Sequence, residues 1–209
     1  MKRSKLLAIA SAAGAALAII PPALAESNFV TGGGALSASA KVDFQITIPK
    51  ILYLRVGTGS AYATGTLANV NTVDLIQFAV PAASVGNGTA ITGTGGDLSG
   101  GVVTAALIGN NGTITLYATA TGALSNGAES INFSEISTAA GTLTSATALA
   151  APTLTNATSA NVTITPAAKV VNRDARWTYT YLNTAPQAAG IYGGVNVNNG
   201  RVTYTASMP

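Results

Sequence analysis

Apolar and polar residues alternate through residues 38–48, near the start of the chain. The apolar positions are Ala38, Ala40, Val42, Phe44, Ile46 and Ile48. Successive side chains of a strand point to opposite faces, so residues 36–48 predict a long strand with one apolar face. Pro49 ends this run, and residues 51–56 predict a second, shorter strand.

Further apolar or alternating runs follow, and Gly, Asn and Pro separate them. They lie at residues 72–80, 102–109, 113–120, 130–136, 161–165, 176–182, 195–197 and 201–208. This series of short strands predicts an all-β antiparallel sandwich or barrel. Gly109–Gly112 and Asn198–Gly200 both contain Asn-Gly, which predicts type I′ hairpins. Residues 138–158 are low in complexity and predict a loop or a weak edge strand.

Residues 1–25 have the pattern of a secretory signal peptide. Lys2, Arg3 and Lys5 precede an apolar run, and Ala23-Leu24-Ala25 is a small-x-small cleavage site. An uncleaved N-terminal anchor is the alternative, but we expect export and a mature chain that begins at Glu26. Residues 26–34 contain three consecutive glycines and predict a flexible leader. A single β-sandwich domain is expected over residues 35–209, including the strand at residues 36–48.

Charge and composition exclude several functions. The formal charge of +3 comes from the three basic residues of the predicted signal peptide, so residues 26–209 have seven basic and seven acidic residues. The basic residues are scattered, which argues against nucleic-acid binding. The chain has no cysteine and no histidine, so the commonest nucleophile–base pairs and metal ligands are missing. No pair of carboxylates brackets a candidate site. We therefore expect neither catalysis nor a cofactor nor a metal site.

The end of the chain also predicts a one-sided strand, whose apolar positions are Val202, Tyr204, Ala206 and Met208. Together with VDFQITIPKILYLRVG near the start and AGIYGG at residues 189–194, this strand resembles the major subunits of chaperone–usher fimbriae, particularly the disulfide-free class 5 (alpha-type) pilins. The resemblance covers both ends of the mature chain. The glycine-rich leader and the greater length depart from the family, and the middle of the chain shows no match.

The resemblance implies an immunoglobulin-like sandwich that a strand from another subunit completes. In such a subunit the residues donated to another copy would be Ala38, Ala40, Val42, Phe44, Ile46 and Ile48. The alternative is that this strand stays in its own sheet. Val202, Tyr204, Ala206 and Met208 would pair with a periplasmic chaperone before an outer-membrane usher assembles the filament. The expected product is a surface fimbria, exported through the periplasm, that supports adhesion to a glycan or surface receptor, or biofilm formation.

The aromatic residues Trp177, Tyr179 and Tyr181 share one face of a predicted strand. They form either part of the core or an exposed surface that stacks on sugar rings. An exposed surface would make the protein a self-contained secreted β-sandwich that binds glycan or matrix. This is the alternative to the fimbrial interpretation.

Overall fold

The computed structural model of the protein describes residues 26–60 and 67–209. The predicted signal peptide therefore lies outside the described residues. The chain divides into two units, one ending at Ile48 and the other comprising Pro49–Pro209. The sandwich thus begins at Pro49 rather than at Ala35.

Residues 26–48 form neither a helix nor a strand in the structure. The alternating run within them has no hydrogen-bonded strand partner, and its large apolar side chains lie open to solvent. Phe44 is 89% exposed and Ile46 is 85% exposed. A strand needs a neighbouring strand for its backbone groups, and these residues have none among those described.

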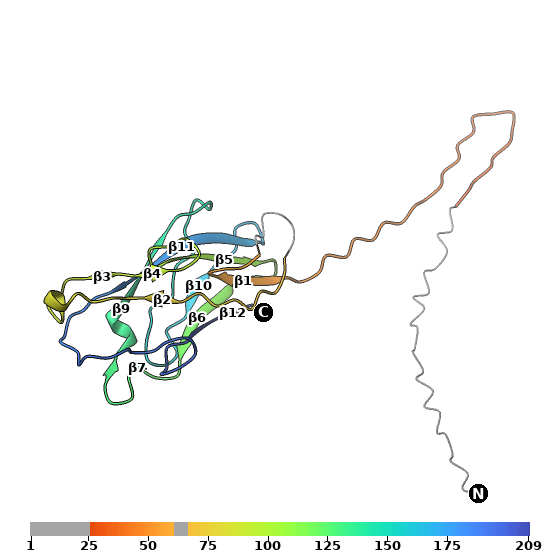
Figure 1. The fold of residues 1–209 in the computed structure, drawn as a ribbon. Coiled ribbons are helices and arrows are strands. Elements are labelled where there is room, and N and C mark those ends of the chain that lie inside the picture. The colour runs from red at the N-terminus through yellow and green to blue at the C-terminus, as the bar shows by residue number, and fades with distance from the viewer. Residues whose placement is uncertain (1–25, 61–66) are drawn as a thin grey trace, which may run out of the picture. The chain divides into compact units, whose positions relative to one another are not determined.

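Residues 49–60 and 67–209 fold as an all-β antiparallel sandwich, as the sequence predicts (Figure 1). The first sheet contains, in order, β1 (Leu52–Val56), β5 (Val102–Gly109), β11 (Val171–Tyr181) and β3 (Ile91–Thr92), and β9 (Ile136–Gly141) also pairs with β11. The second sheet contains β10 (Val162–Ile164), β6 (Ile114–Ala120) and β12 (Val202–Ser207). Two small sheets complete the set: β2 (Ile76–Gln77) with β4 (Thr94–Gly95), and β7 (Leu124–Ser125) with β8 (Ser130–Ile131).

The strand order is that of an immunoglobulin-like sandwich. β1, β5, β11 and β9 follow the A-B-E-D order of such folds, and β6 with β12 corresponds to the C-F pair. Strand G of an immunoglobulin fold lies beside strand F in this second sheet. Within residues 26–60 and 67–209, no strand pairs with β12 on the side opposite β6.

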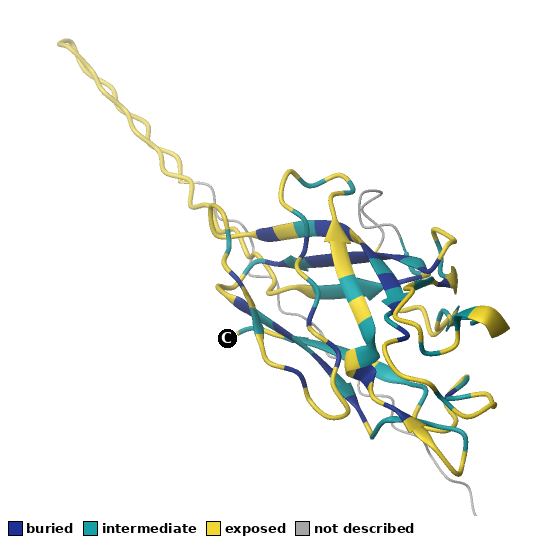
Figure 2. Ribbon diagram, turned by 90° about the vertical axis from the view of Figure 1, so that its left-hand side faces the viewer, coloured by how far each residue is buried: buried dark blue, intermediate teal, exposed yellow. Residues whose placement is uncertain are grey.

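Inward-facing residues of both sheets form the core (Figure 2). On β6, Ile114 and Leu116 are fully buried, whereas Thr115 and Tyr117, each next in sequence, are only partly buried. This alternation is typical of a strand that covers the core with one face. The loop after β9 also contributes Leu149 and Leu154 to the core.

The aromatic run lies in the core, so of the two alternatives the core placement is confirmed and the exposed glycan-binding face is ruled out. Trp177 is 0% exposed, and Tyr179 and Tyr181 are also buried. The indole Nε1–H of Trp177 donates a hydrogen bond of 2.8 Å to the carbonyl oxygen of Leu149. Large aromatic side chains on the inner face of a central strand bury more apolar area than any other residues can, which explains this placement.

Three local predictions differ from the structure. The Gly109–Gly112 turn joins β5 to β6 in opposite sheets and makes no hairpin, since these strands do not pair. Residues 195–197 form a turn rather than a strand. In the predicted strand at residues 72–80, only Ile76–Gln77 pairs with a neighbour.

Candidate functional site

The candidate site is the side of the sandwich where β1 and β12 lie at the edges of their sheets (Figure 1). Within residues 26–60 and 67–209, β1 pairs only with β5, and β12 pairs only with β6. Cα atoms of β1 and β12 come within 8 Å of each other. No backbone hydrogen bond joins the two strands in the described part of the chain. Each strand therefore has one edge free of strand partners, which is a template for pairing with another chain.

Apolar side chains of these two edge strands are only partly covered. Leu54 and Val56 of β1 pack against the core but remain partly exposed. The apolar residues of the predicted C-terminal strand also pack against the core and remain partly exposed. They are Val202, Tyr204, Ala206 and Met208. By contrast, Leu107 on β5 and Leu116 on β6 are fully buried. The edge between the sheets thus has apolar surface that a further strand would cover.

Tyr204 connects this edge to the core. Its ring centroid lies 5.2 Å from that of Trp177, and its hydroxyl lies 2.8 Å from the hydroxyl of Tyr179. Burial raises the pKa of Tyr204 to about 12, even though the hydrogen bond from Tyr179 acts in the opposite direction. Burial also raises the pKa of Tyr179 well above 10.0, and the charge of Tyr204 adds to this effect. Both hydroxyls therefore stay neutral and hydrogen-bonded to each other at neutral pH.

Two asparagines fix one end of the site. The side chain of Asn110 accepts a hydrogen bond of 2.9 Å from the Ile51 amide and donates one of 2.8 Å to the Pro49 carbonyl. The Asn111 side chain donates to the carbonyl of Pro209 over 2.6 Å, and Lys50 Nζ donates to the same oxygen. The turn between the sheets thus ties the start of β1 to the chain that follows β12. Sequence reasoning assigned these asparagines to a hairpin and missed this role.

The structure brings together some of the predicted site residues and not others. It joins Val202, Tyr204, Ala206 and Met208 to Leu54 and Val56, which the sequence did not single out. The predicted donor residues belong to the other unit, and all six are exposed. They are Ala38, Ala40, Val42, Phe44, Ile46 and Ile48.

A metal site and a membrane-spanning helix find no support in the described residues. No group of three or more His, Cys, Asp or Glu side chains there is arranged to hold a metal ion. Nor does this part of the chain contain a helix with the length and apolar character needed to cross a membrane. In comparisons with known proteins, no family model, no curated protein and no solved structure matches the chain.

Proposed function

We propose that the protein is an exported structural subunit of a surface fimbria and that its copies polymerise by donor-strand exchange. Residues 38–48 of one copy would pair with the free edge of β12 in another copy, in the position of strand G. The observation that carries this proposal is that one chain contains, in its described residues, both an unpaired alternating segment and an unpaired sheet edge. The alternating segment has an apolar face and no described partner, while the sandwich has an open edge and partly exposed apolar residues beside it.

In the described structure, the free edge of β12 and the segment at residues 38–48 both have unpaired backbone groups, and each could pair with the other. A lone strand is unstable in water, because its backbone groups and its apolar face find no partner. An unpaired sheet edge is an aggregation hazard in a single molecule. Pairing the two would extend the second sheet and satisfy both backbones.

The side chains of the donated segment would contribute unequally. Phe44, Ile46 and Ile48 would each stabilise the polymer by about 1.5–3 kcal/mol if fully buried. Ala38 and Ala40 would add little, because a methyl side chain has little area to bury. Phe44 and the two isoleucines are therefore the residues to test first.

The proposal requires no catalysis and no cofactor, since polymerisation would draw on burial and strand pairing alone. Before assembly, the same edge of β12 would pair with a periplasmic chaperone, as the resemblance to chaperone–usher fimbriae implies. An outer-membrane usher would then export the growing filament. Surface adhesion or biofilm formation would be the role of the finished fimbria.

A pair of charge-matched variants tests the proposal. Phe44→Asp places a carboxylate on the apolar face of the donated strand, whereas Gln45→Asp places one on the polar face. Both residues lie outside the sandwich, so both variants should export normally and keep the circular dichroism spectrum of the sandwich. Immunogold electron microscopy should show filaments with Gln45→Asp and none with Phe44→Asp. Normal filaments with Phe44→Asp would refute the donor-strand proposal.

A further inference from the structure

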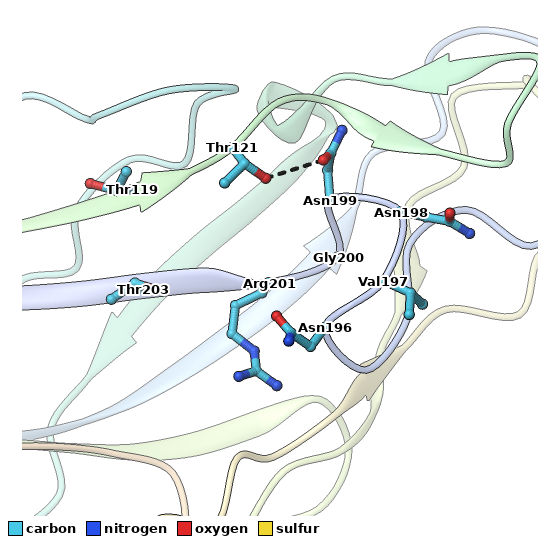
Figure 3. A pocket seen from close by; sticks show the side chains of 9 residues that line it. All are labelled: Thr119, Thr121, Asn196, Val197, Asn198, Asn199, Gly200, Arg201 and Thr203. Atoms are coloured by element: carbon cyan, nitrogen blue, oxygen red, sulfur yellow. Dashed lines mark hydrogen bonds between the residues drawn. The ribbon is translucent and has the colours of Figure 1, made fainter.

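A hollow of about 460 Å³, lined mostly by Thr, Asn and Arg residues, opens at one end of the second sheet (Figure 3). Thr119 of β6 and Thr203 of β12 line it, together with Thr121, Arg201 and the loop at residues 196–200. Thr119 and Thr203 are opposite each other in the β6–β12 ladder. They point away from the core, because their strand neighbours Ala118 and Tyr204 point into it. The hollow is therefore on the outer face of the sandwich.

The loop that forms one wall of the hollow is held in place by hydrogen bonds. Asn198 and Asn199 both have positive φ, of 51° and 59°, and the Gly200 amide donates to the Val197 carbonyl over 2.8 Å. The side chain of Asn199 accepts a hydrogen bond of 3.1 Å from the Thr121 hydroxyl and donates one of 2.9 Å to the Ala123 carbonyl. The wall is thus tied to the end of β6.

The hollow presents hydrogen-bond donors and one positive charge. Arg201 is partly buried, and its guanidinium makes no ion pair or hydrogen bond with any described residue. The Asn196 side chain projects beside it (Figure 3). No Asp or Glu lines the hollow. The balance of charge inside it is therefore positive, although the chain after residue 25 is neutral overall.

We propose that this hollow binds an acidic saccharide, with its carboxylate on Arg201. A guanidinium is planar and matches a carboxylate with two parallel hydrogen bonds. Asn amides and Thr hydroxyls both donate and accept hydrogen bonds, as the hydroxyls of a sugar do. Val197 adds an apolar contact for the carbon face of a ring. The volume lies within the range of small-ligand sites.

Every residue that lines the hollow belongs to one sandwich, so a single subunit would bind the saccharide without residues from another copy. A filament would repeat the site along its length, and several weak contacts to one polysaccharide would then add up to strong attachment. The inference gives the adhesive role a location, which the buried aromatic residues cannot supply.

Binding is measured by isothermal titration calorimetry on the exported chain, with trigalacturonic acid and sialyllactose as acidic probes. Galactotriose and lactose are the neutral counterparts. We expect one or both acidic probes to bind more tightly than the neutral counterpart, by about tenfold or more. Arg201→Gln should weaken that binding by roughly tenfold or more, whereas Arg176→Gln, which removes an exposed charge on β11, should not change it.

The inference would be overturned by the absence of saturable binding by both acidic probes, by equal binding of acidic and neutral probes, or by unchanged binding in Arg201→Gln. Complete competition by an equal concentration of inorganic phosphate would also overturn it, since it would indicate an adventitious anion site. Asn196→Ala provides a second test that keeps the charge, and it should weaken binding of the acidic probe several-fold.

Discussion

The hydroxyl of Tyr204 on β12 lies 2.8 Å from the hydroxyl of Tyr179 on β11, and this hydrogen bond joins the two sheets. The ring of Tyr204 also packs against Trp177. Among the strands of the described residues, β12 has a neighbour on one side only. These contacts hold it on the sandwich while its other edge stays free, which a strand-accepting edge requires.

Replacing both members of the tyrosine pair should cost less free energy of unfolding than the two single replacements added together. In Tyr204→Phe, the buried hydroxyl of Tyr179 loses its partner, and we expect the free energy of unfolding to fall by about 1–3 kcal/mol. The double variant Tyr179→Phe/Tyr204→Phe leaves no orphaned hydroxyl, so its loss should be smaller than the sum of the two single losses. Urea unfolding of the four proteins measures this coupling. Strictly additive losses would show that the bond stabilises nothing.

Alkaline pH should destabilise the protein through the same pair. The folded state raises the pKa of Tyr204 to about 12 and that of Tyr179 well above 10.0. The unfolded chain loses these protons first, near pH 10, so the stabilisation is complete below pH 10. It falls as the pH rises from 10 to 12, by about 2 kcal/mol or more from Tyr204. Urea unfolding between pH 8 and 12 tests this, and the double phenylalanine variant should lose most of the dependence. If the double variant keeps the same pH dependence of the unfolding free energy, that dependence comes from other titrating groups.

Asp174 should hold the loop that follows β9 in place by hydrogen bonds. Its buried carboxylate accepts hydrogen bonds of 2.9 Å and 2.8 Å from the amides of Thr144 and Ser145, and another from the Thr144 hydroxyl. Asp174→Ala leaves those donors without this acceptor, and we expect the free energy of unfolding to fall by about 2–4 kcal/mol. Limited proteolysis should then cut near residue 144, whereas the parent protein should resist. Unchanged stability and cleavage would contradict this role.

The ion pair between Arg55 and Asp97 should anchor β1 to the glycine-rich loop before β5. Arg55 Nη2 lies 2.9 Å from Asp97 Oδ2, and Asp97 Oδ1 accepts a hydrogen bond of 2.7 Å from the Thr104 amide. Both side chains are largely buried, with 18% and 12% exposed. Asp97→Ala leaves the guanidinium without its carboxylate, so we expect a loss of about 2–4 kcal/mol in unfolding free energy. Adding Arg55→Met should recover part of it, and urea unfolding that shows a further loss instead would contradict this account.

The pattern of the sequence predicts the sandwich well where strands alternate cleanly. β5 spans Val102–Gly109 as expected, and β6 begins one residue later than predicted. β11 begins at Val171, five residues before its predicted start. Asp174 interrupts the apolar pattern there, and only the covering loop makes a buried carboxylate tolerable.

Contacts between segments far apart in the sequence could not be predicted. Asn110 and Asn111 do not have the positive φ of a type I′ hairpin, because they bond to Pro49, Ile51 and Pro209 instead. Asn198 and Asn199 do have positive φ, but their turn precedes β12 without a strand before it. The core role of Leu149 in a low-complexity segment depends on its contact with Trp177. Turn residues fix local angles, whereas strand partners depend on the whole fold.

The central claim is that residues 38–48 pair with the free edge of β12 in another copy. Hydrogen–deuterium exchange, read by mass spectrometry on filaments and on single subunits, tests it without assuming a pairing register. In single subunits the amides of residues 38–48 should exchange rapidly, because the segment forms no strand. In filaments we expect their exchange to slow by orders of magnitude, together with that of β12. Equally fast exchange of residues 38–48 in both states would contradict the account.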